Sequence, residues 1–427
     1  MKYKKNIISN IIVHVFSLLF GFVSSILIAR GLGAENQGQF SFYVLIFGLI
    51  AAYGHFGLTT SVSYFIKKTK YEDNHIINTN LSVLLLLSIF YFIVIFFLKG
   101  VIFSNNYILL IIWTIYYISL LVSNYFMNIY MAHENVYIYN RFLNLNTILK
   151  VTTISILYFT HNISVVSVSI TYACLELLKF ILMLRGLHLE YKFEIHKNIL
   201  KEELKYGIPL YLSALFLYLN YRVDQVMVKS YNGEAALGVY ALSVTLAELA
   251  KMVPDSVVSA FTGKLYNCEE EQKKRIVIQT IKLSFYMTVI ISIIGVFCKP
   301  LIKILYGEEF IKAGLSMIIL LIGIPFLTIG KVSSVYFYTN GKTKVHMRIA
   351  FSVLVVNLVL NFLLIPKYGI YGAAFTSTVS YIFYAIVYLI MLNKYNISAK
   401  SIMIINKEDI SLLKNYLLKL KKKILKK

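Results

Sequence analysis

The sequence predicts an all-α polytopic membrane protein with twelve transmembrane helices in two six-helix lobes. Three observations lead to this prediction. Of the 427 residues, 58% are hydrophobic and 15% charged, which is more apolar surface than the core of a soluble protein can cover. Apolar blocks of about 20 residues, the length that crosses a bilayer, follow one another along most of the chain. A short glycine motif occurs at equivalent places in the two halves.

The apolar blocks are separated by short polar connections, so few soluble segments remain. The first block follows Lys2, Lys4 and Lys5. Its length and the absence of a small-residue cleavage site predict a retained helix instead of a secretory signal. We predict spans at residues 9–29, 39–60, 79–98, 107–131, 142–159, 163–184, 207–228, 237–261, 278–297, 313–339, 349–365 and 370–392.

Positive charge is distributed unevenly along the chain. The formal net charge is +22, from 42 Lys and Arg against 20 Asp and Glu. Most of the Lys and Arg residues lie in the two termini and the even-numbered connections. Because such residues collect on the cytoplasmic side of a membrane protein, we expect both termini in the cytoplasm. The charge then reflects topology, and we expect no nucleic-acid partner, since no basic and aromatic domain accompanies the spans.

The longest polar connection after the N-terminal tail, residues 185–206, divides the spans into two sets of six. We therefore expect an N-terminal lobe at 1–184, a cytoplasmic linker at 185–206, a C-terminal lobe at 207–392 and a basic cytoplasmic tail at 393–427. The end of the tail places leucines on one helical face among lysines, which suits a helix on an anionic membrane surface. A disordered basic tail fits almost as well.

A motif of the form G-x4-G-x-aromatic is repeated at an offset of 200 residues. One copy contains Gly33 and Gly38, the other Gly233 and Gly238, and each lies in the external turn between the first two spans of its half. Six spans return the chain to the same side, so the halves form a parallel repeat. Two such lobes are the architecture of an alternating-access transporter. We therefore expect transport and no enzyme activity, with no catalytic residue, cofactor or metal.

Two longer segments resemble a known family. Residues 27–40 read Leu-Ile-Ala-Arg-Gly-Leu-Gly-Ala-Glu-Asn-Gln-Gly-Gln-Phe, with Gly57-Leu58 further on, and residues 357–374 read Asn-Leu-Val-Leu-Asn-Phe-Leu-Leu-Ile-Pro-Lys-Tyr-Gly-Ile-Tyr-Gly-Ala-Ala. Over essentially the whole chain, the sequence resembles the bacterial polysaccharide repeat-unit flippases. These form the O-antigen and capsule branch of the multidrug/oligosaccharidyl-lipid/polysaccharide exporter superfamily. We expect structural motifs, with glycines permitting close packing and Pro366 ending the eleventh span.

The resemblance implies a fold like that of the multidrug and toxin extrusion (MATE) transporters, in the bacterial cytoplasmic (inner) membrane. It implies a flippase that moves undecaprenyl-pyrophosphate-linked oligosaccharide repeat units from the cytoplasmic to the outer leaflet by alternating access. The product would be O-antigen lipopolysaccharide or capsule, and membrane lipids, a polymerase and glycosyltransferases would be partners. Two alternatives stay open: an ion-coupled multidrug or cation antiporter on the same fold, and a scaffold without transport activity.

Ionisable residues within spans are costly, and they are the first candidates for function. Arg222 and Asp224 stand two positions apart and cannot pair within a helix, and Lys150 has no charged residue within four positions. A pyrophosphate requires a cationic cavity, so cations and their polar neighbours are the expected substrate contacts. We predict these to be Arg222, Lys150, Arg30, Lys251, Lys331, Tyr221 and Asn220.

Three further residues are predicted to couple transport to an ion. Asp224, His14 and Glu176 are candidates because a desolvated carboxylate or an imidazole can titrate near neutral pH. For Asp224, a plain counter-ion role toward Arg222 is an equal alternative.

Several of the charged residues within spans are also spaced for a structural role. Glu176 with Lys179, and Glu248 with Lys251, are three positions apart, so each pair can neutralise its charges along one helix face. Asp255 lies a further four positions on. Lysines in the inner half of the membrane, such as Lys179 and Lys331, could instead reach the cytoplasmic headgroups.

Overall fold

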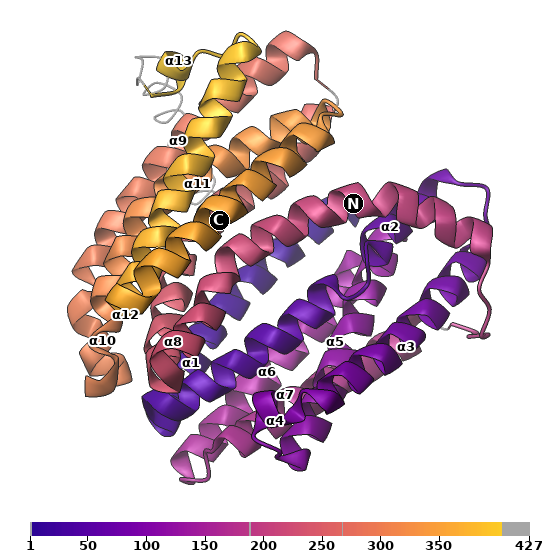
Figure 1. Cartoon of the computed structure of the whole chain (residues 1–427). Helices are drawn as coiled ribbons and strands as arrows, with labels where there is room; N and C mark the ends of the chain where they lie inside the picture. The colour runs from indigo at the N-terminus through magenta and orange to yellow at the C-terminus, as the bar shows by residue number, and fades with distance from the viewer. Residues whose placement is uncertain (1, 188, 267, 404–427) are drawn as a thin grey trace, which may run out of the picture. The chain divides into compact units, whose positions relative to one another are not determined.

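The computed structural model describes residues 2–187, 189–266 and 268–403, with only the backbone described for 2–18 and a few other positions. Within these residues the chain is helical, without a β-strand, as predicted (Figure 1). The predicted tail beyond residue 403 lies outside the described residues. The helices are α1 (Lys2–Tyr53), α2 (Leu58–Lys68), α3 (Asp73–Phe97), α4 (Lys99–Phe103), α5 (Tyr107–Ala132), α6 (Val136–Phe159), α7 (Val165–Leu187), α8 (Lys197–Tyr266), α9 (Glu270–Phe297), α10 (Lys299–Tyr306), the 3₁₀ turn η1 (Glu308–Phe310), α11 (Ala313–Thr339), α12 (Thr343–Lys394) and α13 (Ala399–Met403).

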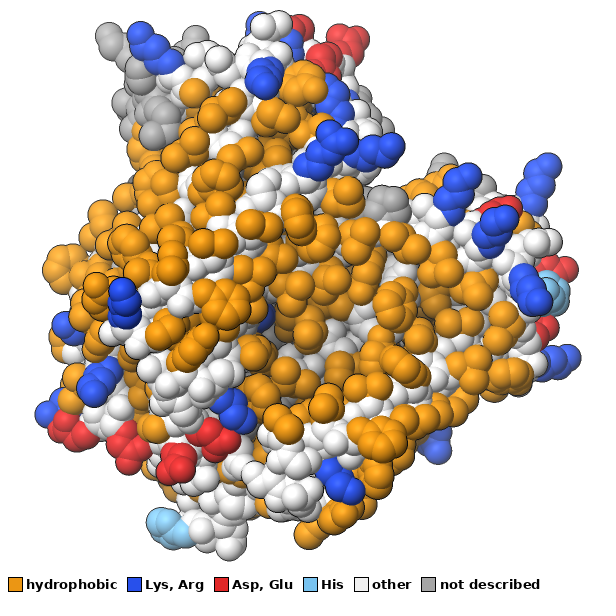
Figure 2. Space-filling model, in the orientation of Figure 1, with side chains coloured by type: hydrophobic (Ala, Val, Ile, Leu, Met, Phe, Trp, Pro, Cys, Tyr) orange, Lys and Arg blue, Asp and Glu red, His pale blue; other side chains and the backbone are white. Residues whose placement is uncertain are grey.

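Nine helices of the described chain are long and apolar enough to cross a membrane. Three of these, in α1, α8 and α12, are interrupted by one glycine each, at Gly33, Gly233 and Gly369. Nine is three fewer than the twelve spans predicted, and three is also the number of interrupted helices in the described chain. Apolar side chains cover most of the face seen in Figure 2, and charged ones gather toward its margins. The molecule is a multi-pass membrane protein.

The helix breaks at Gly33 and Gly233 share one backbone conformation. Gly33 has φ 72° and ψ 173°, and Gly233 has φ 86° and ψ −178°. Side chains with a Cβ rarely adopt such torsion angles, so glycine is required at both places. The chain reverses direction at equivalent points of the two halves, as the sequence motif predicts.

The two copies of the glycine motif contact each other reciprocally. A Cβ added at Gly38 would lie 1.8 Å from the Glu234 carbonyl oxygen, and one at Gly238 would lie 2.0 Å from the Ala34 carbonyl oxygen. The offset of 200 residues converts each contact into the other. Only glycine leaves room for two backbones this close together.

The third break corrects one prediction. Pro366 does not end its helical segment; it lies inside α12, and the break falls at Gly369, with φ 54° and ψ −132°. Proline removes one backbone donor and can be accommodated within a membrane helix, whereas a positive φ stops the helix. Within the same motif, Asn361 donates to Asn357, which donates to Ser380 across the break at 2.8 and 3.1 Å. This buried network ties the two segments of α12 to each other.

The chain divides into two compact units, residues 1–241 with 302–312, and residues 242–301 with 313–427. The first unit contains an aromatic core in which Phe47 stacks on the single Trp113 at 5.4 Å and on Phe103 at 5.7 Å between ring centroids. In the second unit α11 packs against α9 and α12 (Figure 1). The lobe boundaries at 184 and 207 stay a prediction, since units defined by packing need not follow the repeat.

Candidate functional site

Lys150 of α6 and two charged residues of α7 form a cluster in the first unit. The Lys150 ammonium lies 4.0 Å from the centroid of the Tyr172 ring. Glu176, one turn further along α7, forms an ion pair with Lys179, and both side chains are less than a tenth exposed. This pairing was predicted from the spacing. Lys150 also interacts electrostatically with Glu176 and Lys179, so the cluster brings two lysines and one glutamate together.

Four polar residues of α8 lie before its break. Asp224 and Asn220 are buried, and Tyr221 and Arg222 are half-buried. The Tyr240 hydroxyl, beyond the break, donates to Asp224 Oδ2 at 2.5 Å, and the Gln225 backbone N–H donates to Oδ1 at 2.8 Å. Both oxygens of this carboxylate thus accept a hydrogen bond.

The second unit holds another group of charged residues, from α8 and α11. Lys251 donates to Glu248 at 2.9 Å, the pairing predicted from their spacing. Asp255 pairs with Lys331 of α11, which the sequence spacing did not indicate. Each lysine therefore has a carboxylate partner. Neither Lys331 nor Lys179 needs the membrane surface to satisfy its charge, so the snorkelling interpretation is not required for either.

Two other predicted site residues lie apart from these clusters. Arg30 is exposed and donates from its guanidinium to the Ile304 carbonyl oxygen. A neighbouring carboxylate, Glu309, accepts a hydrogen bond from the Ala34 backbone N–H at 2.6 Å, where the helix restarts after Gly33. That position favours a negative charge, since a helix N-terminus is partially positive. The side chain of His14 lies outside the described residues.

Glu203, near the start of α8, is a buried acid that the sequence analysis missed. Its Oε1 accepts hydrogen bonds from Asn80 at 3.1 Å and Ser61 at 3.3 Å, and burial raises the pKa of Glu203 to about 7. The residue stands in a highly charged stretch, from Lys201 to Lys205, and such stretches are usually exposed to solvent. Helical spacing was the available signal, because Ile199 and Gly207, four positions to either side, are also buried.

These arrangements place paired charges and an aromatic ring within an apolar protein. An ammonium group beside an aromatic ring can contact an anion and a sugar ring. The ion pairs in both units reduce the cost of holding charge within an apolar protein.

Comparisons with known proteins show which families and relatives the chain resembles. Residues 3–263 match the family model described as "Polysaccharide biosynthesis protein", and residues 209–363 match the model described as "MatE". The capsular polysaccharide biosynthesis protein CapF of Staphylococcus aureus is 23% identical over 387 residues, which cover 88% of this chain and 96% of that protein.

Solved structures of transporters share the fold. The lipid II flippase MurJ in an inward closed conformation superposes with a TM-score of 0.78 at 17% identity, over 91% of this chain and 87% of that one. An inward-facing MATE family multidrug transporter superposes with a TM-score of 0.73 at 15% identity, over 90% of this chain and 95% of that one. The family model covers more than half of the chain, and the protein belongs to the polysaccharide biosynthesis protein family.

Proposed function

We propose that this protein is a flippase that moves undecaprenyl-pyrophosphate-linked oligosaccharide repeat units from the cytoplasmic to the outer leaflet. Membership of the polysaccharide biosynthesis family is the observation that carries the proposal. A relative named for capsular polysaccharide biosynthesis and a fold shared with a lipid II flippase support it. The product is a surface polysaccharide, either capsule or O-antigen.

The chemistry of the substrate requires cations within the membrane. A pyrophosphate loses its hydration in the cavity and needs fixed positive charges to replace it. Lys150, beside Tyr172, provides an ammonium and an aromatic face together. Arg222 provides a guanidinium that can bind two phosphate oxygens at once. We propose these two cations as the principal contacts, with Arg30, Lys251 and Lys331 as further ones and Tyr221 and Asn220 binding sugar hydroxyls.

Translocation proceeds in this proposal by alternating access of the lobes at 1–184 and 207–392, coupled to an ion through Asp224, His14 or Glu176. Both termini lie in the cytoplasm, and the polymerase and glycosyltransferases of the same polysaccharide are partners. A reporter enzyme that is active only outside the cytoplasm, fused after residue 403, tests this orientation. An active reporter would contradict it.

The test of the function is surface polysaccharide in a deletion strain complemented with variants. We expect Lys150→Ala and Arg222→Ala to insert normally in the membrane but to lower surface glycan at least tenfold, with lipid-linked repeat units accumulating inside. Lys201→Ala is the matched control, because Lys201 is exposed near the start of α8, before its membrane segment. Normal surface glycan in both site variants would contradict the assignment of these residues.

The alternative is an ion-coupled multidrug or cation antiporter, which the MatE match over residues 209–363 favours. The two activities are distinguished in the same deletion strain. Resistance to cationic dyes that depends on the protein, with unchanged surface glycan, would support the antiporter and contradict the flippase.

A further inference from the structure

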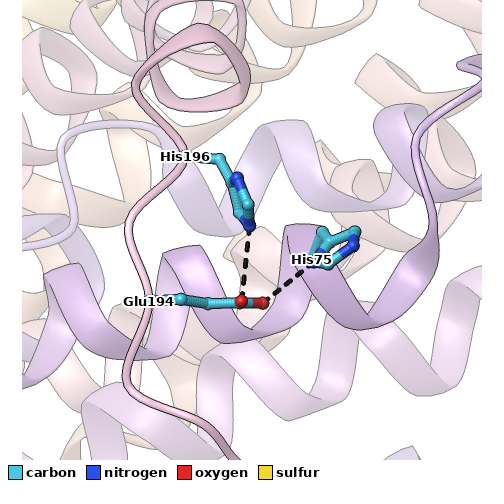
Figure 3. Close-up of side chains that lie close together, drawn as sticks. All are labelled: His75, Glu194 and His196. Atoms are coloured by element: carbon cyan, nitrogen blue, oxygen red, sulfur yellow. Dashed lines mark hydrogen bonds and ion pairs between the residues drawn. The ribbon is translucent and has the colours of Figure 1, made fainter.

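Two histidines and a glutamate converge at the start of α3, outside the predicted membrane site (Figure 3). His75 stands in the first turn of α3, whereas Glu194 and His196 belong to the extended segment between α7 and α8. His75 Nδ1 lies 3.0 Å from Glu194 Oε1, and His196 Nε2 lies 3.4 Å from Glu194 Oε2. The three potential ligand atoms all lie within 4.8 Å of one another.

These separations are close to those of a tetrahedral metal site. With metal–ligand bonds of 2.0 to 2.2 Å, the corners of such a tetrahedron are about 3.3 Å apart. The two imidazole-to-carboxylate distances lie near this value, with His75 facing Oε1 and His196 facing Oε2 of the same Glu194 carboxylate. The His75 and His196 rings, with centroids 4.6 Å apart, face the same carboxylate. Both histidine side chains are nearly half exposed, whereas the His196 Nε2 atom itself is buried, so the His196 ring has to rotate for an ion to bind.

The structure positions these side chains through a surrounding set of hydrogen bonds. Asn78 donates to Glu194 Oε1 at 3.2 Å, and this hydrogen bond restrains the orientation of the carboxylate. The Glu194 backbone N–H donates to Ser82 Oγ at 3.1 Å, and that of His196 donates to Thr79 Oγ1 at 3.2 Å. In known metal sites, hydrogen bonds to surrounding groups likewise orient the ligands.

We propose that His75, Glu194 and His196 bind one transition-metal ion of the Zn²⁺ class, which fastens the segment before α8 to α3. Two imidazoles and one carboxylate select zinc and its neighbours over magnesium or calcium, which prefer oxygen ligands. A water molecule completes the coordination, and Glu72, 3.6 Å from the other nitrogen of His75, adds negative charge nearby. His75 and Glu194 are 119 positions apart in the chain, so no sequence spacing indicates this site.

The ion links two segments that side-chain hydrogen bonds already hold together. Residues 189–196 join the two sets of six predicted spans, so the metal restrains the connection between the halves of the chain. Binding to the folded state alone stabilises that state by RT ln(1 + c/Kd), where c is the metal concentration, so the stabilisation rises with the logarithm of the metal concentration above Kd.

The experiment titrates Zn²⁺ into the full chain, purified in detergent with its affinity tag removed and treated with a chelator. We expect about one saturable equivalent by calorimetry, and slower hydrogen exchange in residues 189–196 once Zn²⁺ is bound. Glu194→Gln, His75→Gln and the double variant of both histidines should each lower the affinity at least tenfold and abolish the exchange protection. Asn78→Ala should lower it roughly tenfold.

His161→Asn is the matched control, because His161 is an exposed histidine in the turn after α6 and asparagine tolerates its positive φ. This control should bind zinc as the wild type does. Gel filtration and the thermal midpoint without metal identify any variant that fails to fold. The zinc affinities of the single variants that do fold then test the proposal. No saturable binding to the wild type, or equal affinity in the wild type and all folded site variants, would overturn the proposal.

Discussion

The first two helical segments of each half have the same backbone and different chemistry. Gly33 and Gly233 break their helices with matching torsion angles, and Gly38 and Gly238 make reciprocal contacts. Asp224 and Tyr240, hydrogen-bonded in the second half, correspond at the 200-residue offset to Ser24 and Phe40 in the first. Both halves have glycine at the positions where the backbone requires it. Only the second half has the buried Asp224–Tyr240 pair.

The surroundings of the two breaks differ as well. After Gly33, the restarting helix is capped by Glu309. Open space surrounds the position of a Cβ at Gly233, and Glu234 forms an ion pair with Lys229 at 3.2 Å. Equivalent turns can therefore be stabilised by unrelated partners, because the backbone conformation requires only the glycine.

The largest effect is expected where the two halves touch. Gly38→Ala and Gly238→Ala each place a methyl group against a backbone oxygen, which cannot move aside as a side chain would. Each should cost about 3 kcal/mol or more in the free energy of unfolding. The measurements are the thermal midpoint and the fraction of folded protein in gel filtration.

Gly21→Ala is the control for these glycine variants, because nothing lies within 4 Å of its added Cβ. It should not destabilise the protein, since alanine favours helix more than glycine does. A tolerated change at either contact glycine would show that the reciprocal contact is not required.

Glu203 is a second difference between the halves, because the corresponding residue in the first half is Tyr3. Burial raises the pKa of Glu203 from 4.5 to about 7, so the folded protein holds the proton more tightly than the unfolded chain. Stability from this residue is present below pH 4.5, declines as the pH rises to about 7, and is constant above that. The loss is on the order of 3 kcal/mol.

Glu203→Gln removes the ionisation and should raise the thermal midpoint over wild type at pH 8, with little difference near pH 5. Differential scanning fluorimetry across this range measures both. Glu202→Gln changes the exposed neighbour and should leave the pH profile as in the wild type. Parallel profiles for Glu203→Gln and wild type would exclude this titration.

The buried Asp224–Tyr240 pair is tested by changing both residues to those at the equivalent positions of the first half, Ser24 and Phe40. Tyr240→Phe leaves Asp224 without one of its donors and should cost about 1–3 kcal/mol. Adding Asp224→Ser should recover part of this loss, because the buried carboxylate is then gone. A double-mutant cycle on the thermal stability gives the coupling energy, and additive single effects would mean that the pair does not interact.

The smallest effect is expected at Arg30, whose counterpart is Ser230. Arg30→Ser removes an exposed hydrogen bond to the Ile304 carbonyl oxygen and should cost about 0.5 kcal/mol. Because the expected effect is small, a thermal midpoint of Arg30→Ser within the scatter of repeated wild-type measurements also agrees with this prediction. A loss as large as that of Gly38→Ala would show that Arg30 supports the turn.

The features of the fold that depend on local sequence were predictable. Apolar length marks the spans, and a glycine motif marks the breaks at Gly33 and Gly233. Pairs on one helix face, such as Glu248 and Lys251, follow from spacing. Partners on different helices do not, so the Asp255–Lys331 ion pair and the His75–Glu194 contact emerged only from the folded chain.

The reciprocal contact at Gly38 and Gly238 has a consequence for the ancestry of the chain. When one surface meets its own copy so that position i contacts j and j contacts i, the interface is isologous, the form found in C₂ homodimers. Residues 34 and 38 against 234 and 238 have this form within one polypeptide. A six-span ancestor carrying the turn once would already possess a self-complementary dimer interface, and gene duplication followed by fusion would have made that dimer permanent.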